Sequence, residues 1–194
     1  MIICAGEIES FEFAKPMGIG MVDTAINLTK ECIANPPYFL LFIGSAGTYG
    51  EHKIFDIVES TTASNIENSF FNAKSYTPID NIVSMNDNVS HETMLKSSKN
   101  IMSDNNVSCE TIVNSSNYIT TDERVSEYYL SNNIGLENME FYAVLKVAKA
   151  FNISARGVFI VTNRCDKNAH ADFIKNHKEA MQRLTDYLKR HKKI

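Results

Sequence analysis

The 194-residue sequence contains no tryptophan and only four cysteines, and no two of the cysteines form a CxxC pair. Paired cysteines are typical of proteins that depend on disulfides or on structural zinc. Their absence favours reduced thiols and a cytoplasmic location. A chain of this length can bury a full hydrophobic core without such cross-links.

Excess positive charge and long apolar segments are also missing. The formal net charge of -4 and the pI of about 5.7 argue against a nucleic-acid partner, because nucleic-acid-binding surfaces are usually basic. The one basic cluster, at 189–193, ends an expected helix, where cations stabilise the helix dipole. No apolar run approaches the roughly 20 residues of a membrane span, and no signal peptide precedes the first expected strand. We therefore expect no membrane partner.

The common motifs for metals and nucleotide cofactors are absent as well. The five histidines show no HExxH pattern or other paired spacing. Gly18-Ile19-Gly20 lacks the third glycine of a dinucleotide fingerprint. The glycines at 44–50 lack the Gly-Lys-Ser/Thr ending of a phosphate-binding P-loop. The sequence therefore predicts no metal site and no bound cofactor.

The most informative segment present is YFLLFIGSAGTYG, at 38–50. The residues from Tyr38 to Ile43 are apolar or aromatic without alternation, which is typical of a strand buried on both faces. The small residues Gly44–Gly47 are expected to end this strand and to let a ligand approach the backbone N–H groups. Since ligands of open α/β sheets bind beyond the carboxyl ends of strands, we predict an active-site floor here.

Strands and helices alternate along most of the chain. Apolar residues spaced three and four apart at 22–33 indicate an amphipathic helix, and GVFIV at 157–161 indicates a second buried strand. Further strands are expected at 1–5, 11–14, 54–58, 82–85 and 110–113, and further helices at 91–102, from 137 and from 172. This order predicts an α/β fold with one domain over 1–194 and a mixed, mostly parallel central sheet flanked by helices.

Several of these motifs together resemble the nucleoside phosphorylase and nucleosidase superfamily. Gly18-Ile19-Gly20, a helix, FIGSAG at 42–47 and FDIV at 55–58 follow one another in the family's order. Asn138-Met139-Glu140 is similar to the family's Met-Glu pair, and NRCD at 163–166 follows the last strand. The resemblance extends from about Gly18 to the C-terminus, and it implies a domain shortened at its N-terminus.

Members of this superfamily cleave the N-glycosidic bond of nucleosides, so the resemblance implies a nucleoside as the small-molecule partner, and we expect a purine nucleoside. The transition state has oxocarbenium character, with positive charge on the sugar and negative charge on the departing base. Such a reaction requires a hydrogen-bond or proton donor to the base, contacts to the ribose hydroxyls and a nucleophile beneath the sugar. A homo-oligomer, dimer or hexamer, is also implied.

The resemblance assigns roles to individual residues. Asp166 matches the carboxylate that protonates the purine, although the same residue could instead cap the turn before the last helix. Glu140 matches the acid that binds the ribose hydroxyls, or it could serve only the helix dipole. Tyr118 matches the aromatic that stacks on the base, or it could be a core tyrosine. The remaining substrate-binding candidates are Ser45, Gly47, Met139 and Arg164.

The sequence leaves open which nucleophile attacks the sugar and which acidic residue activates it. Glu9 matches the acid that activates water in nucleosidases, with Glu7 and Glu12 as alternatives. Phosphorylases of the family hold phosphate with arginines, but Phe42 occupies one of these positions and no arginine precedes Arg124. Phosphate thus remains a possible co-substrate, and water is slightly favoured. Two other functions remain: a catalytically idle nucleoside-binding protein on the same fold, and a Rossmann-like methyltransferase.

Overall fold

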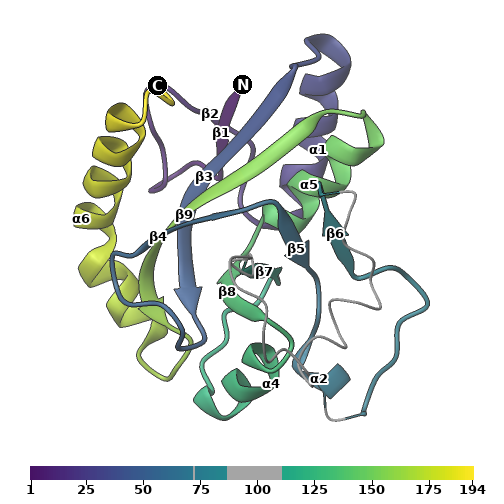
Figure 1. The fold of residues 1–194 in the computed structure, drawn as a ribbon, viewed down its shortest axis with the longest axis vertical. Coiled ribbons are helices and arrows are strands. Elements are labelled where there is room, and N and C mark those ends of the chain that lie inside the picture. Colours follow the sequence, from purple (N-terminus) through teal and green to yellow (C-terminus); the bar gives the residue numbers. More distant parts are fainter. Residues whose placement is uncertain (72, 87–110) are drawn as a thin grey trace, which may run out of the picture.

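The computed structural model describes residues 1–71, 73–86 and 111–194 (Figure 1). The helix expected at 91–102 lies outside these residues. The strands are β1 (Ile2–Cys4), β2 (Lys15–Pro16), β3 (Phe39–Thr48), β4 (Ile57–Ser60), β5 (Thr62–Ser64), β6 (Ile82–Ser84), β7 (Ile112–Ser115), β8 (Ile134–Asn138) and β9 (Ser154–Arg164). The helices are α1 (Gly20–Ala34), α2 (Asn68–Phe71), α4 (Ser126–Leu130), α5 (Phe141–Ala150), α6 (Ala169–Arg190) and the 3₁₀ helix η2 (Glu123–Val125).

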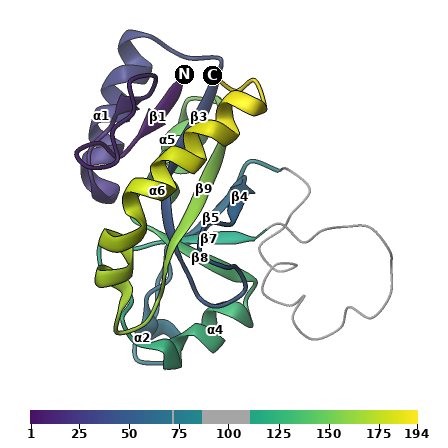
Figure 2. The same cartoon turned by 90° about the vertical axis from the view of Figure 1, so that its left-hand side faces the viewer.

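One mixed sheet connects these strands, in the order β2-β1-β3-β8-β7-β5-β6, with β9 pairing with β3 and β4. Among the described residues, five strand pairs are parallel and three are antiparallel. Helix α6 covers one face of β3 and β9, and α1 and α5 lie on the other face (Figures 1 and 2). The predicted α/β fold, with a mostly parallel central sheet flanked by helices, is confirmed.

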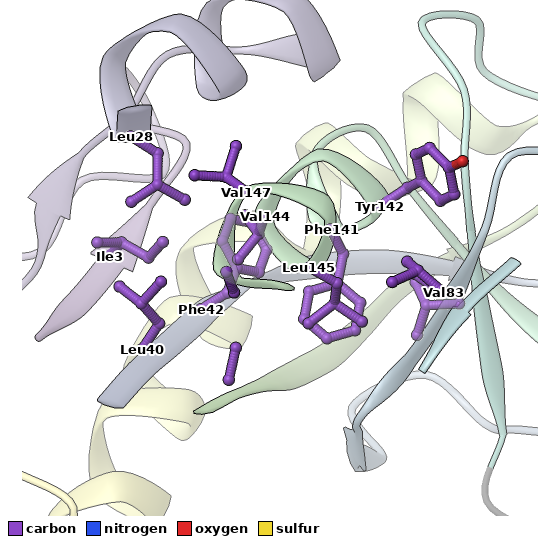
Figure 3. Packing of buried hydrophobic residues seen from close by; sticks show 14 of the residues in the cluster. Ile3, Leu28, Leu40, Phe42, Val83, Phe141, Tyr142, Val144, Leu145 and Val147 are labelled. Atoms are coloured by element: carbon purple, nitrogen blue, oxygen red, sulfur yellow. The ribbon is translucent and has the colours of Figure 1, made fainter. Parts of the chain in front are cut away.

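The core confirms that β3 is buried on both faces from Leu40 onward, whereas Tyr38 and Phe39, which begin the predicted apolar run, are exposed. Leu40 and Phe42 point toward α1 and α5, where Phe42 packs near Phe141, and Figure 3 shows this cluster. Leu41 and Ile43 point the other way, toward α6. This alternation follows from the two-residue period of a strand, and it explains why an unbroken apolar run is required.

The edge of β3 changes partner partway along the strand. Near its start β3 pairs with β1 at Leu41 and Phe42, and near its end it pairs with β8 at Gly47 and Thr48. The opposite edge pairs with β9 over the whole length. Ser45 lies in the gap between β1 and β8, so its backbone groups are available to side chains.

Some expected element boundaries were wrong. β3 does not end at Ile43 but continues through the glycine-rich segment to Thr48, because β9 pairs with it throughout. β4 begins at Ile57, since the positive φ of Phe55 interrupts extended backbone. The segment 11–14 forms a turn, closed by a hydrogen bond from the Ala14 N–H to the Phe11 carbonyl, and not a strand.

Two further boundaries differ at the ends of β8 and β9. The segment expected to open a helix at 137 is instead the end of β8, and the helix α5 begins at Phe141. β9 continues to Arg164, and α6 begins at Ala169. In the described parts of the chain, no helix has the length and apolar character that would let it cross a lipid bilayer.

Candidate active site

A cavity of about 290 Å³ lies where β3, β8 and β9 end and α5 and α6 begin. The predicted site residues that line it are Glu9, Ser45, Gly47, Met139 and Glu140. The lining also includes residues that the sequence analysis did not single out as site residues, among them Ile119, Glu137, Asn138, Asn163, His170 and Phe173. The structure thus brings together Ser45 of β3, Glu9, which precedes β2, and Glu140, which precedes α5.

Glu9 reaches the cavity from a tight turn. Gly6 and Glu7 both have positive φ, and the Glu9 N–H donates to the Gly6 carbonyl. This turn directs the Glu9 carboxylate to the gap in the sheet, where its Oε1 accepts a hydrogen bond of 3.2 Å from the Ser45 N–H. Burial raises the pKa of Glu9, and the hydrogen bond from Ser45 partly offsets this shift.

Glu140 enters the cavity from the start of α5. Its Oε1 accepts a 2.8 Å hydrogen bond from the Gly20 N–H, at the beginning of α1, where free N–H groups favour a negative charge. Burial raises the pKa of Glu140 to about 7, and the nearby Glu9 carboxylate adds to the increase. Two buried carboxylates therefore share one cavity.

Asn138 fixes the geometry between these two glutamates. Its Oδ1 accepts hydrogen bonds from the N–H groups of Glu140 and Phe141, which caps α5. Its Nδ2 donates to the Ser45 carbonyl at 3.1 Å. A single side chain therefore ties the start of α5 to the middle of β3. The sequence places Asn138 beside Glu140, but this capping role depends on the strand that precedes α5.

The raised pKa of Glu140 predicts a pH-dependent stability. Between the unfolded pKa of roughly 4.3 and the folded pKa of about 7, the folded chain binds more protons than the unfolded chain. The contribution of Glu140 to the free energy of unfolding therefore falls as the pH rises through this window, by roughly 3 to 4 kcal/mol. We expect Glu140→Gln, which retains an acceptor for Gly20, to flatten this part of the pH profile.

Urea denaturation of both proteins between pH 5 and pH 8 checks this expectation. Glu9 and Glu137 also have raised pKa values because of burial, so only the difference between wild type and the variant isolates Glu140. Parallel profiles for the two proteins would show that Glu140 does not titrate in this range.

Asp166 does not line this cavity, contrary to expectation. Its Oδ1 accepts a 2.7 Å hydrogen bond from the Asn168 N–H, so the side chain shapes the turn that leads into α6. Asp166 instead faces a separate polar cleft, together with Arg124 and Arg164. The residue of this segment that lines the cavity is Asn163, because β9 continues past the apolar run and places it at the sheet edge.

Arg164 and Tyr118 also lie away from the cavity. Arg164 is exposed next to Gly50, and the Tyr118 side chain is 84% exposed. Ile119, one residue further on, lines the cavity in place of Tyr118. The placements of Asp166, Arg164 and Tyr118 therefore give no support to their assigned contacts with the base.

Gly47 makes room for Asn163. A Cβ atom at Gly47 would lie 2.9 Å from both Asn163 Nδ2 and Cys165 Sγ, which is too close for a side chain. Gly47 therefore brings bare backbone to this side of the cavity. Within the described ranges, no cluster of three His, Cys, Asp or Glu residues could hold a metal ion.

Comparison with known proteins supports the family resemblance. A family model described as "Phosphorylase superfamily" matches residues 3–191. A search of curated proteins found no match.

Several solved structures share the fold. Helicobacter pylori 5′-methylthioadenosine/S-adenosylhomocysteine nucleosidase, as a mutant with 5′-methylthioadenosine in its active site, has a TM-score of 0.72 and 16% identity, over 97% of this chain and 95% of that chain. Futalosine hydrolase from the same organism has a TM-score of 0.72 and 16% identity, over 97% and 94% of the two chains. The Streptococcus pneumoniae nucleosidase, with a transition-state inhibitor, has a TM-score of 0.70 and 15% identity, over 96% and 95%.

Proposed function

Because the chain belongs to the phosphorylase superfamily, we propose that it is a nucleosidase, which cleaves the N-glycosidic bond of a purine nucleoside with water as the nucleophile. The observation that carries this proposal is the pair of buried carboxylates, Glu9 and Glu140, in one cavity. Preorganised negative charge in a poorly solvated site stabilises the positive charge that develops on the sugar.

Each carboxylate has a distinct role in this proposal. Glu140 accepts hydrogen bonds from the ribose hydroxyls and so orients the sugar. Glu9 takes the proton of a water molecule as the water oxygen bonds to C1′ and the bond from C1′ to the base breaks. The pKa of Glu9, raised by burial, makes the carboxylate a stronger base than an exposed glutamate.

Water is favoured over phosphate by the charge of the cavity. None of the described residues that line it is lysine or arginine, whereas four glutamates, Glu7, Glu9, Glu137 and Glu140, are present. A phosphate anion placed beside these carboxylates would be repelled and would lack a cationic partner from this part of the chain. A water molecule requires no such partner. The nucleosidase and hydrolase names of the structural neighbours agree with this choice.

Asn163 is the proposed contact to the departing base. Its Oδ1 accepts a hydrogen bond from the Thr162 hydroxyl, and one Nδ2 hydrogen is donated to the Arg164 carbonyl at 3.1 Å. The second hydrogen on Nδ2 is available to a nitrogen of the base, where negative charge develops. An amide stabilises this charge but does not transfer a proton, so the base takes its proton from water. The bound 5′-methylthioadenosine of one structural neighbour agrees with a purine.

The placement of Asp166 also favours a second candidate, a catalytically idle nucleoside-binding protein. With Asp166 outside the cavity, the acid expected to protonate the base is missing from it. A binding protein needs only the ribose and base contacts. Both candidates predict that a bound nucleoside raises the melting temperature, so only a measurement of turnover distinguishes them.

Incubation of the protein with inosine, adenosine, 5′-methylthioadenosine and uridine, with and without phosphate, tests the proposal. We expect release of free base from at least one purine nucleoside, at a rate that does not depend on phosphate. Strict dependence on phosphate would show a phosphorylase. Thermal stabilisation by a nucleoside without any turnover would show the idle binding protein.

A further inference from the structure

A third buried glutamate, Glu137, lines the cavity near the end of β8. Its carboxylate accepts hydrogen bonds from residues of three other segments of the chain. Oε1 accepts from the Thr120 N–H at 2.8 Å, with the Cys165 thiol at 4.0 Å, and Oε2 accepts from the Tyr49 hydroxyl at 2.8 Å. The Thr120 hydroxyl also donates to Oε2. Thr120 is therefore held to Glu137 by both its backbone and its side chain.

The sheet register places Glu137 beside the proposed base contact. Gly47 of β3 pairs with Glu137 on one side and with Asn163 on the other. Residues paired directly across strands point to the same face, so Glu137 and Asn163 flank Gly47 on one wall of the cavity. Ser45, which binds Glu9, lies two residues earlier on β3, roughly 7 Å away along the strand. Glu9, which is proposed to activate the water, is thus displaced along β3 from this wall.

The contacts of Thr120 determine where the adjacent segment lies. Ile119 lines the cavity, and Tyr118 turns outward. At its other end the segment is held by the Asn117 side chain, whose Oδ1 accepts a hydrogen bond of 3.1 Å from the Met21 N–H. Residues 117–120 are therefore held at both ends, with Ile119 at the cavity, and Glu137 supplies the anchor at Thr120.

We infer that Glu137 is a positioning residue, which fixes Thr120 and thereby Ile119 as the wall against which the base packs. This inference rests on the proposed function, because it assigns the Asn163 end of the cavity to the base. A carboxylate suits the task because it accepts hydrogen bonds without competing as a donor. Loss of this anchor releases the wall and weakens nucleoside binding, while the carboxylates at the sugar remain in place.

The test compares four variants of the full chain. Glu137→Leu removes every acceptor, whereas Glu137→Gln keeps an oxygen for the Thr120 N–H, and its amide can donate to the Thr120 and Tyr49 hydroxyls. Thr120→Val removes only the hydroxyl. Tyr49→Phe is the matched control, because it also removes a hydrogen bond to the Glu137 carboxylate. Tyr49 stacks on Tyr129 and does not line the cavity.

We expect Glu137→Leu to raise KM for the nucleoside that is cleaved fastest by roughly 10- to 100-fold, with a smaller change in kcat. Thr120→Val is expected to raise KM by about fivefold, and Glu137→Gln to stay within about threefold of wild type. Tyr49→Phe should lower the melting temperature and leave KM within about twofold. If Glu137→Leu does not fold, Thr120→Val carries the test.

Unchanged KM in both Glu137→Leu and Thr120→Val, with only the melting temperature lowered, would overturn the inference and leave Glu137 a structural residue. A wild type without turnover on any nucleoside refutes the proposed function instead. In that case the Kd of 5′-methylthioadenosine, measured by calorimetry, replaces KM, and equal Kd values in wild type and all four variants overturn the positioning role separately.

Discussion

Glu9→Gln is expected to lower kcat by roughly 10²- to 10⁴-fold, with a much smaller change in KM. The glutamine side chain has nearly the same volume and still offers an oxygen to the Ser45 N–H, so the local structure is retained. The amide cannot accept the proton of the attacking water, and it removes a negative charge that faces the sugar. Steady-state kinetics with the nucleoside that is cleaved fastest measures the effect.

Glu12→Gln is the matched control for this variant. Glu12 lies three residues further on, carries the same carboxyl group and does not line the cavity. Glu7 lies at the cavity but is exposed, so we expect Glu7→Gln to lower kcat by less than about threefold. A large loss in Glu7→Gln or Glu12→Gln, with Glu9→Gln fully active, would assign the activating acid to another member of this acidic turn.

Asn163→Ala is expected to lower kcat by roughly 10²-fold, because it removes a donor aimed at the charge that develops on the departing base. Asp166→Asn, three residues away, is expected to change kcat by less than about threefold. The asparagine keeps the oxygen that accepts from the Asn168 N–H, so the turn before α6 is preserved. The pair of variants compares a residue inside the cavity with one outside it.

The reverse pattern would restore the original assignment of Asp166. Asp166→Asn would then lose most of its turnover, which would mean that the turn before α6 rearranges when the nucleoside binds. Asn163→Asp is a third variant for this comparison, since an acid at the cavity could donate a proton to the base. Faster turnover of nucleosides with poor leaving groups in Asn163→Asp would agree with a hydrogen bond, and not a proton, from the native Asn163.

Much of the architecture could be predicted because the spacing of apolar residues within a short segment indicates which sides of that strand or helix are buried. The unbroken apolar runs of β3 and β9 follow from burial on both faces, and the spaced apolar residues of α6 follow from burial on one. The helix α1 was predicted from apolar residues at 22–33, but Val22, Ile26 and Ile33 of that set are exposed. The buried side of α1 instead carries Gly20, Thr24, Leu28 and Cys32. The order of small motifs predicted the superfamily, which the family model over residues 3–191 confirms.

The ends of β8 and β9 could not be predicted, because polar residues occupy them. Glu137 and Asn138 look like the start of a helix, and Asn138 does cap α5, but both belong to β8. Thr162 and Asn163 look like a loop, yet their backbone pairs with β3. Hydrophobic periodicity gives no signal at these positions, since Glu137, Asn138 and Asn163 line the cavity and the Thr162 hydroxyl is satisfied by Asn163 Oδ1.

Asp166 was assigned by its resemblance to the family's carboxylate, and it was expected in the loop that follows the strand at 157–161. Asn163 was not considered as a site residue. With β9 extended to Arg164, Asn163 reaches the cavity and Asp166 falls in the following turn. Glu9 and Ser45, in contrast, meet through a turn at Gly6 and Glu7 that the sequence did not reveal.

A crystal structure of Glu9→Gln with 5′-methylthioadenosine tests the central claim most directly, namely that one cavity holds the sugar between Glu9 and Glu140. We expect the ribose hydroxyls at about 3 Å from the Glu140 carboxylate, with C1′ facing residue 9 and the base beside Asn163. A nucleoside bound instead in the polar cleft of Arg124, Arg164 and Asp166, with this cavity empty, would contradict it.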